Sequence, residues 1–62
     1  MYQVLLADDE QIVLRGLMKR IHWEQLDCQV AACSDSGEEA FRLAMELKPD
    51  IVITDIKMPG KT

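Results

Sequence analysis

Apolar residues gather in three short runs along the chain. They cover residues 2–7 (YQVLLA), 28–33 (CQVAAC) and 50–55 (DIVITD). Runs of this length without a polar alternation are typical of strands that are covered on both faces, as in a parallel sheet. We therefore predict a strand over each run, with Asp50 as a polar residue at the start of the third.

The segment 10–21 between the first two runs has a helical period. Its apolar residues recur at spacings of three and four, at Leu14, Leu17, Met18 and Ile21. This spacing places them on one face of a helix. Gly16 lies inside the predicted helix, where glycine costs up to about 1 kcal/mol relative to alanine, which suggests close packing at that point. Glu10 is interpreted as an acid of the first turn, with at most a minor role in any nearby site.

A second helix is predicted in the segment between residues 34 and 50. Ser36 and Glu39 have the Ser-x-x-Glu spacing of a capping box, and Pro49 ends the helix. The predicted inner face consists of Ala40, Leu43, Ala44 and Leu47.

The resulting order is strand–helix–strand–helix–strand. Right-handed crossovers between successive strands imply a parallel sheet and an α/β fold. The connection HWEQLD, residues 22–27, holds Trp23 and Leu26, which we predict to anchor it to the core.

Composition narrows the classes of function. The chain has 62 residues, 48% of them hydrophobic, and a formal net charge of −4. This length fits one small domain, and the acidic balance argues against direct contact with nucleic acid or an anionic membrane by this segment. No apolar run approaches the roughly 20 residues that cross a bilayer, and the first residues lack the features of a signal peptide.

Two cysteines, Cys28 and Cys33, lie in the second predicted strand. An offset of five residues along a strand places them on opposite faces, about 16 Å apart, so they cannot form a disulfide. We predict two buried, reduced thiols, as suits a cytoplasmic protein, and no zinc site.

Acidic residues follow the first and third predicted strands. Asp8 and Asp9 come after the first, and Asp55 ends the third. If the strand order is 2-1-3, all three carboxylates meet at one edge of the sheet, where ligands of open α/β folds bind. Oxygen ligands alone favour Mg²⁺, Mn²⁺ or Ca²⁺, and a carboxylate beside such a metal can act as a nucleophile toward phosphorus. Without Asp55, a helix N-cap with a solvated neighbour would be the preferred explanation of the acid pair.

The motifs VLLADDE and DIVITDIKMPG resemble the receiver domain of two-component response regulators. The resemblance covers essentially all 62 residues but only about the first half of a family domain. It implies an α/β, three-layer, flavodoxin-like fold, a doubly wound parallel sheet of order 2-1-3-4-5. Residues 1–62 are thus expected to be a truncated receiver domain with its first three strands and first two helices, in the partial order 2-1-3.

The resemblance also implies roles for individual residues. Asp55 matches the aspartate that accepts a phosphoryl group from a sensor histidine kinase, and the domain is not a turnover enzyme. Asp9 matches the direct ligand of Mg²⁺, Asp8 the acid that holds the metal through water, and Lys57 the residue whose backbone carbonyl binds it. Pro59 and Gly60 match the turn that shapes this loop.

Two later residues of the family, a hydroxyl residue and a lysine, have no counterpart in this sequence. We therefore expect that the 62-residue chain does not signal normally by itself. Its third strand should be an open edge, which favours self-association as a homodimer. A weaker resemblance, through the tryptophan after the first helix, is to receivers joined to AraC-type DNA-binding domains, so the longer protein is expected to regulate transcription.

Two other functions remain open. One is a Mg²⁺-dependent phosphohydrolase with an aspartyl intermediate; such enzymes resemble D-x-D-G-T at the nucleophile, and DIKMP has no acid at the third position of that pattern. The other is a non-catalytic half-domain that only associates with itself.

Overall fold

The computed structural model of the chain describes residues 1–54. Its elements follow the predicted order, with one added turn of 3-10 helix, η1, between the first helix and the second strand. Their bounds are β1 (Tyr2–Ala7), α1 (Gln11–Arg20), η1 (Trp23–Leu26), β2 (Cys28–Ser34), α2 (Gly37–Leu47) and β3 (Ile51–Thr54).

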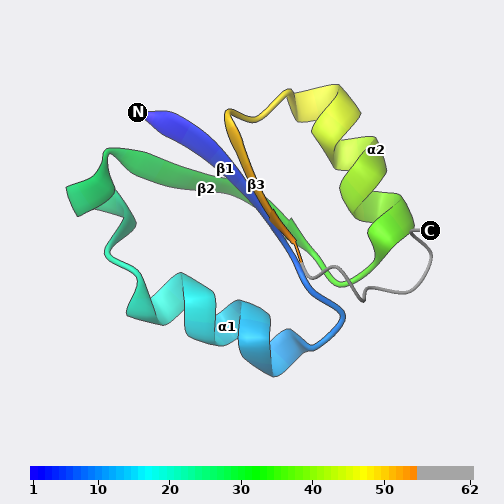
Figure 1. Cartoon of the computed structure of the whole chain (residues 1–62), viewed down its shortest axis with the longest axis horizontal. Helices are drawn as coiled ribbons and strands as arrows, with labels where there is room; N and C mark the ends of the chain where they lie inside the picture. Colours follow the sequence, from blue (N-terminus) through cyan, green and yellow to red (C-terminus); the bar gives the residue numbers. More distant parts are fainter. Residues whose placement is uncertain (55–62) are drawn as a thin grey trace.

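The three strands form one parallel sheet in the order β2-β1-β3. The chain passes from β1 to β2 in one direction across the sheet, and from β2 back past β1 to β3 in the opposite direction. Since both crossovers are right-handed by rule, their helices must cover opposite faces. Figure 1 shows α1 and α2 on opposite sides of the sheet. The predicted three-layer α/β architecture with partial strand order 2-1-3 is therefore confirmed.

The core is centred on β1, the middle strand. Val4, Leu5 and Leu6 are fully buried, and burying a side chain of this size contributes roughly 1.5–3 kcal/mol. On one face, a cluster of Val4, Leu6, Leu14 and Cys28 is joined by Leu17, Trp23 and Val30. On the other, Ala7 packs against Ala40 of α2. The continuous apolar run of β1 thus reflects cover on both faces, as predicted.

The start of α2 follows the predicted capping motif only in part. The Ser36 hydroxyl accepts a hydrogen bond from the Glu39 N–H at 3.4 Å. The Glu39 carboxylate accepts instead from the hydroxyl of Ser34, at 2.9 Å, and the Ser36 N–H donates to that same hydroxyl oxygen, at 3.1 Å. Ser34, which is 3% exposed, therefore takes the central position of this turn.

Several predicted burials are wrong. Cys33 is exposed, whereas Cys28 is buried, and both thiols are free. Within residues 1–54, β2 is an edge strand that pairs with β1 alone. A register shift after Val4 places Cys28 opposite Tyr2 and Cys33 opposite Leu6, so the two cysteines share one face of the sheet and do not lie on opposite faces as predicted.

Leu26 is exposed because η1 is a single turn, of whose two apolar residues only Trp23 packs against the core. Met18, on the predicted inner face of α1, and Leu47, on the predicted inner face of α2, are also exposed.

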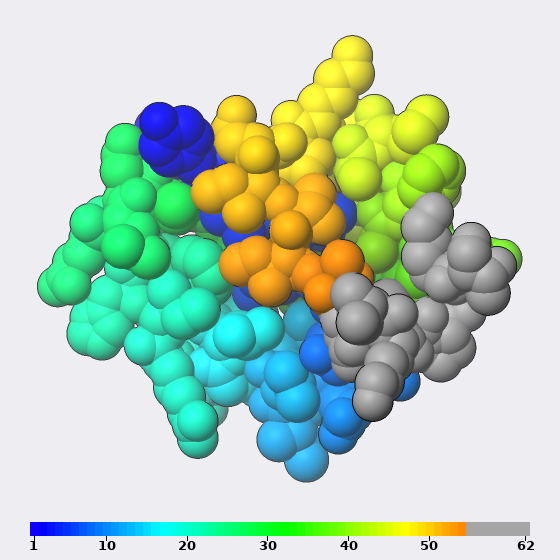
Figure 2. Space-filling model, viewed as in Figure 1, coloured from blue at the N-terminus to red at the C-terminus, as the bar shows by residue number. Residues whose placement is uncertain are grey.

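β3 is an edge strand in the described part of the chain. All four of its residues are exposed, Ile51, Val52 and Ile53 by 36–48%. Figure 2 shows β3 on the front of the molecule between α1 and α2, with β1 largely hidden behind it. Neither helix in residues 1–54 has the length and apolar composition of a membrane span.

Candidate functional site

The acid pair of the sequence lies where β1 turns into α1. Asp8 continues the sheet by one residue, because its N–H donates to the Ser34 carbonyl at 3.0 Å. Its side chain then closes the turn: the Asp8 Oδ1 accepts from the Glu10 N–H at 2.9 Å. This local hydrogen bond is one that aspartate commonly makes two residues along the chain. Asp8 is only 9% exposed, so its carboxylate is held in one orientation beside the sheet.

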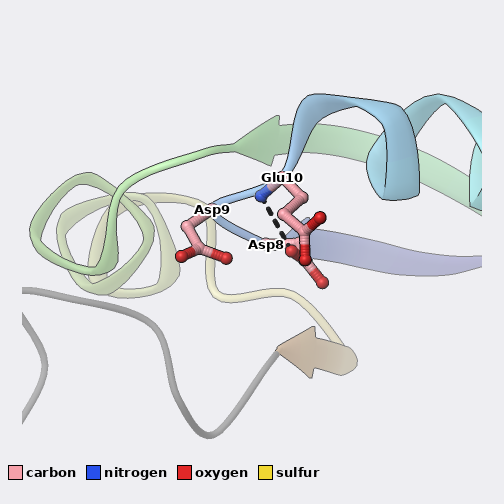
Figure 3. Close-up of side chains that lie close together, drawn as sticks. All are labelled: Asp8, Asp9 and Glu10. Carbon is pink, nitrogen blue, oxygen red and sulfur yellow. Dashed lines mark hydrogen bonds between the residues drawn. The ribbon is translucent and has the colours of Figure 1, made fainter.

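Asp9 and Glu10 are exposed and complete a group of three carboxylates with Asp8, which we call the acid cluster. One oxygen from each side chain lies within 4.8 Å of the others. Figure 3 shows the three side chains on a single turn, with the Asp8–Glu10 hydrogen bond that fixes it. Two like charges about 4 Å apart repel by about 1 kcal/mol in water and about 4 kcal/mol near a protein surface. The turn therefore gathers negative charge that a cation would neutralise.

The donors of the acid cluster fit a hard divalent cation. All three are carboxylates, and Mg²⁺ typically binds through one or two carboxylates while it keeps several waters. In residues 1–54, this is the one group of three or more potential metal ligands, and it contains neither His nor Cys, which disfavours zinc. Glu10 was predicted to lie in the first turn of the helix. It is instead the N-cap residue of α1, which brings its carboxylate to the acids before it.

The carboxyl end of β3 lies beside the acid cluster. The parallel register pairs Ala7, the last residue of β1, with Thr54, the last residue of β3. The two strands therefore end at the same edge of the sheet. The other predicted site residues, Asp55, Lys57, Pro59 and Gly60, lie outside the described residues.

Comparison with known proteins identifies the same family as the sequence motifs. The family model described as "Response regulator receiver domain" matches residues 4–62. The chain is 47% identical over 60 residues to the uncharacterized transcriptional regulatory protein YesN of Bacillus subtilis, and it is 44% identical over 61 residues to the response regulator GacA of Pseudomonas viridiflava. Each match covers 97% of this chain, which spans 16% of YesN and 28% of GacA.

The fold agrees with a solved structure of the same kind. The receiver (REC) domain of AraT, a response regulator from Geobacillus stearothermophilus, superposes with a TM-score of 0.91 at 37% identity. The superposition covers 95% of this chain and 46% of that one. The flavodoxin-like arrangement expected from the sequence is thus confirmed for the described strands and helices. On these matches, the chain belongs to the family of response regulator receiver domains.

Proposed function

We propose that this chain is the phosphoacceptor module of a two-component response regulator and receives a phosphoryl group on Asp55 from a sensor histidine kinase. The observation that carries the proposal is the position of the acid cluster. It lies at the carboxyl end of β1, beside the end of β3, and Asp55 is the next residue after β3. Open parallel sheets bind their ligands at this edge.

The metal of this site is proposed to be Mg²⁺, held by Asp8, Asp9, Asp55 and the backbone carbonyl of Lys57. The difference between the two acids of the turn supports distinct roles. Asp9 is exposed and free to bind the ion directly, whereas Asp8 is mostly buried and one of its oxygens already accepts a hydrogen bond. Asp8 is thus suited to hold the metal through water. When bound, Mg²⁺ neutralises charge on the phosphoryl oxygens.

The chemistry of the chain itself is a single transfer. A carboxylate oxygen of Asp55 attacks the phosphorus of the kinase phosphohistidine. The O–P bond forms as the P–N bond breaks, and the histidine nitrogen keeps the electron pair. Pro59 and Gly60 are proposed to shape the loop around this reaction. Because the transfer leaves Asp55 modified, the module acts as a switch and not as a turnover enzyme.

Titration calorimetry with Mg²⁺ tests this assignment. We expect Asp9→Asn and Asp55→Asn each to weaken Mg²⁺ binding by about tenfold or more, since changes around a metal commonly cost that much. Glu46→Gln is the matched control, because it also removes one negative charge, from the exposed ion pair with Arg42 on α2. An affinity of Asp55→Asn equal to that of the unmodified chain contradicts the proposal.

The longer protein is proposed to be a cytoplasmic transcriptional regulator. Among the relatives, YesN and LnrK of Bacillus subtilis are both named as transcriptional regulatory proteins. LnrK is 45% identical to this chain over 60 residues, and the chain spans 26% of it. DNA recognition would then belong to the parts of such a protein beyond this acidic segment.

Self-association through β3 is a second proposal, favoured by the exposure of that edge. Within residues 1–54, β3 pairs with β1 alone, so Ile51, Val52 and Ile53 combine an open strand edge with exposed apolar side chains, and such edges recruit other strands. We expect Val52→Lys to shift the 62-residue chain toward monomer in light scattering. Ile12→Lys, on the exposed side of α1, is the control for a general gain in charge. A folded monomer of the unmodified chain at micromolar concentration contradicts the proposal.

A further inference from the structure

The start of β3 is tied to β1 by two hydrogen bonds between the same two residues. The Asp50 N–H donates to the Gln3 carbonyl at 2.9 Å. The Gln3 N–H donates in return to the side chain of Asp50, with 2.8 Å between the nitrogen and Oδ2. Asp50 therefore contacts Gln3 through its backbone and its carboxylate at once.

The carboxylate occupies the place of a backbone carbonyl. In a parallel ladder, a residue donates to one residue of its neighbour and accepts from another two positions further along. The pairing of Val4 with Ile51, continued by one residue, places Gln3 opposite Asp50, so the Gln3 N–H would ordinarily donate to the carbonyl of the preceding residue, Pro49. The chain turns immediately before this point, at Lys48, which adopts a left-handed conformation with φ 48° and ends α2 with its N–H on the Ala44 carbonyl. Asp50 supplies the acceptor that the ladder lacks at this point.

The remaining residues of β3 do not fix its alignment with β1. Ile51, Val52 and Ile53 are all β-branched and apolar, and none is buried in residues 1–54. Register is strongly specified where a buried face would be exchanged for an exposed one, and weakly specified otherwise. A shift by one residue here would replace one exposed apolar side chain with another. Asp50 is the polar residue whose side-chain hydrogen bond to Gln3 distinguishes the observed register from a shifted one.

Register decides where β3 ends. The observed pairing runs from Val4 with Ile51 to Ala7 with Thr54. A shift by one residue moves the strand end by about 3.3 Å and turns every side chain to the other face. We infer that Asp50 is a positioning residue for the phosphoacceptor: it fixes the β1–β3 register and so sets where the chain leaves the sheet toward Asp55. This inference rests on the function proposed for Asp55.

The test compares three variants of the 62-residue chain. Asp50→Ala removes the side-chain acceptor, Asp50→Asn keeps an acceptor oxygen without the charge, and Glu46→Ala removes an exposed carboxylate that pairs with Arg42 at 3.1 Å within α2. Nuclear Overhauser effects between Val4 and Ile51, and between Leu6 and Ile53, report the register. Titration calorimetry with Mg²⁺ reports the effect on the site.

We expect Asp50→Ala to lose the native inter-strand signals and to bind Mg²⁺ about tenfold more weakly, as for other supporting residues of metal sites. Asp50→Asn and Glu46→Ala should keep both. Native signals in Asp50→Ala, or a Mg²⁺ affinity equal to that of Glu46→Ala, overturn the inference. If Asp50→Ala does not fold, hydrogen exchange of the backbone amides in the unmodified chain decides. The inference requires that the Gln3 N–H is protected to the same degree as the other β1 amides that face β3, and faster exchange at Gln3 overturns it.

The two proposals fail in different ways. If Asp55→Asn leaves Mg²⁺ binding unchanged, the proposed function is wrong. The claim that Asp50 positions the phosphoacceptor is then wrong as well. The inter-strand signals still decide whether Asp50 sets the register. If Asp55→Asn weakens binding and Asp50→Ala does not, the proposed function stands and the positioning role is wrong.

Discussion

The substitution Asp8→Asn changes the charge of the acid cluster while its shape is kept. The side-chain amide oxygen of the variant can still accept from the Glu10 N–H, so the hydrogen bond that closes the turn at 2.9 Å is retained. The repulsion of Asp8 with Asp9 and with Glu10 is removed. The substitution therefore isolates the electrostatic part of the turn.

The size of the effect follows from the spacing. At the 4.8 Å limit between the oxygens, each pair repels by about 0.9 kcal/mol in water and about 3.5 kcal/mol at an effective dielectric near 20. Because Asp9 and Glu10 are exposed, the lower end applies. We expect Asp8→Asn to raise the free energy of unfolding by about 1–2 kcal/mol in metal-free buffer, and this gain should shrink as salt screens the charges.

Magnesium should reverse the order of stability of Asp8→Asn and the unmodified chain. A free Mg²⁺ concentration of ten times Kd stabilises the unmodified chain by about 1.4 kcal/mol, whereas a variant that binds poorly gains little. Urea denaturation followed by circular dichroism, with EDTA and with Mg²⁺, measures both differences. Glu46→Gln, the control, should lose at most a few tenths of a kcal/mol in either buffer, as exposed helix ion pairs contribute little. Lower stability of Asp8→Asn in EDTA, or equal stabilisation of both chains by Mg²⁺, would refute the reasoning.

Two further substitutions test the packing that supports the site, both by urea denaturation. Ser34→Ala should lower the free energy of unfolding by about 1–3 kcal/mol, because it leaves the Ser36 N–H and the Glu39 carboxylate without the hydroxyl that they share; a loss below about 0.5 kcal/mol would show that water replaces it. Leu5→Ala should cost about 2–5 kcal/mol, since Leu5 is fully buried. That is comparable to the roughly 3–5 kcal/mol which so small a core supplies, so the variant should be largely unfolded at 25 °C; a cooperative, native-like transition would contradict this.

The sequence predicts the features of this fold that depend on local pattern. The unbroken apolar run of β1 predicts a strand that is covered on both faces, and the helical spacing before and after β2 predicts the two helices. The acid pair was found because it follows a strand, and the carboxyl end of a strand is a position that topology alone defines. These predictions needed no knowledge of which residues touch.

The features that were missed depend on what lies beside a residue. Cys33 was predicted to lie on the face opposite Cys28, but the register shift between β1 and β2 places both cysteines on one face of the sheet. Gly16 was expected at a close contact, yet a Cβ there would meet no described atom within 4 Å. The side-chain hydrogen bond of Asp50 to Gln3 could not be predicted either, since it depends on the turn from α2 into β3, after which a carboxylate and not a backbone carbonyl is the acceptor.

Paramagnetic broadening by Mn²⁺ tests the central claim, that Asp8 and Asp9 of the acid cluster hold one cation together with Asp55. Mn²⁺ has the same preference for oxygen ligands as Mg²⁺ and broadens the amide resonances nearest to it. In the 62-residue chain, we predict that substoichiometric Mn²⁺ broadens residues 8–10 and 55–57 in parallel, and that excess Mg²⁺ restores both groups together. Broadening of residues 8–10 without residues 55–57 would contradict the account.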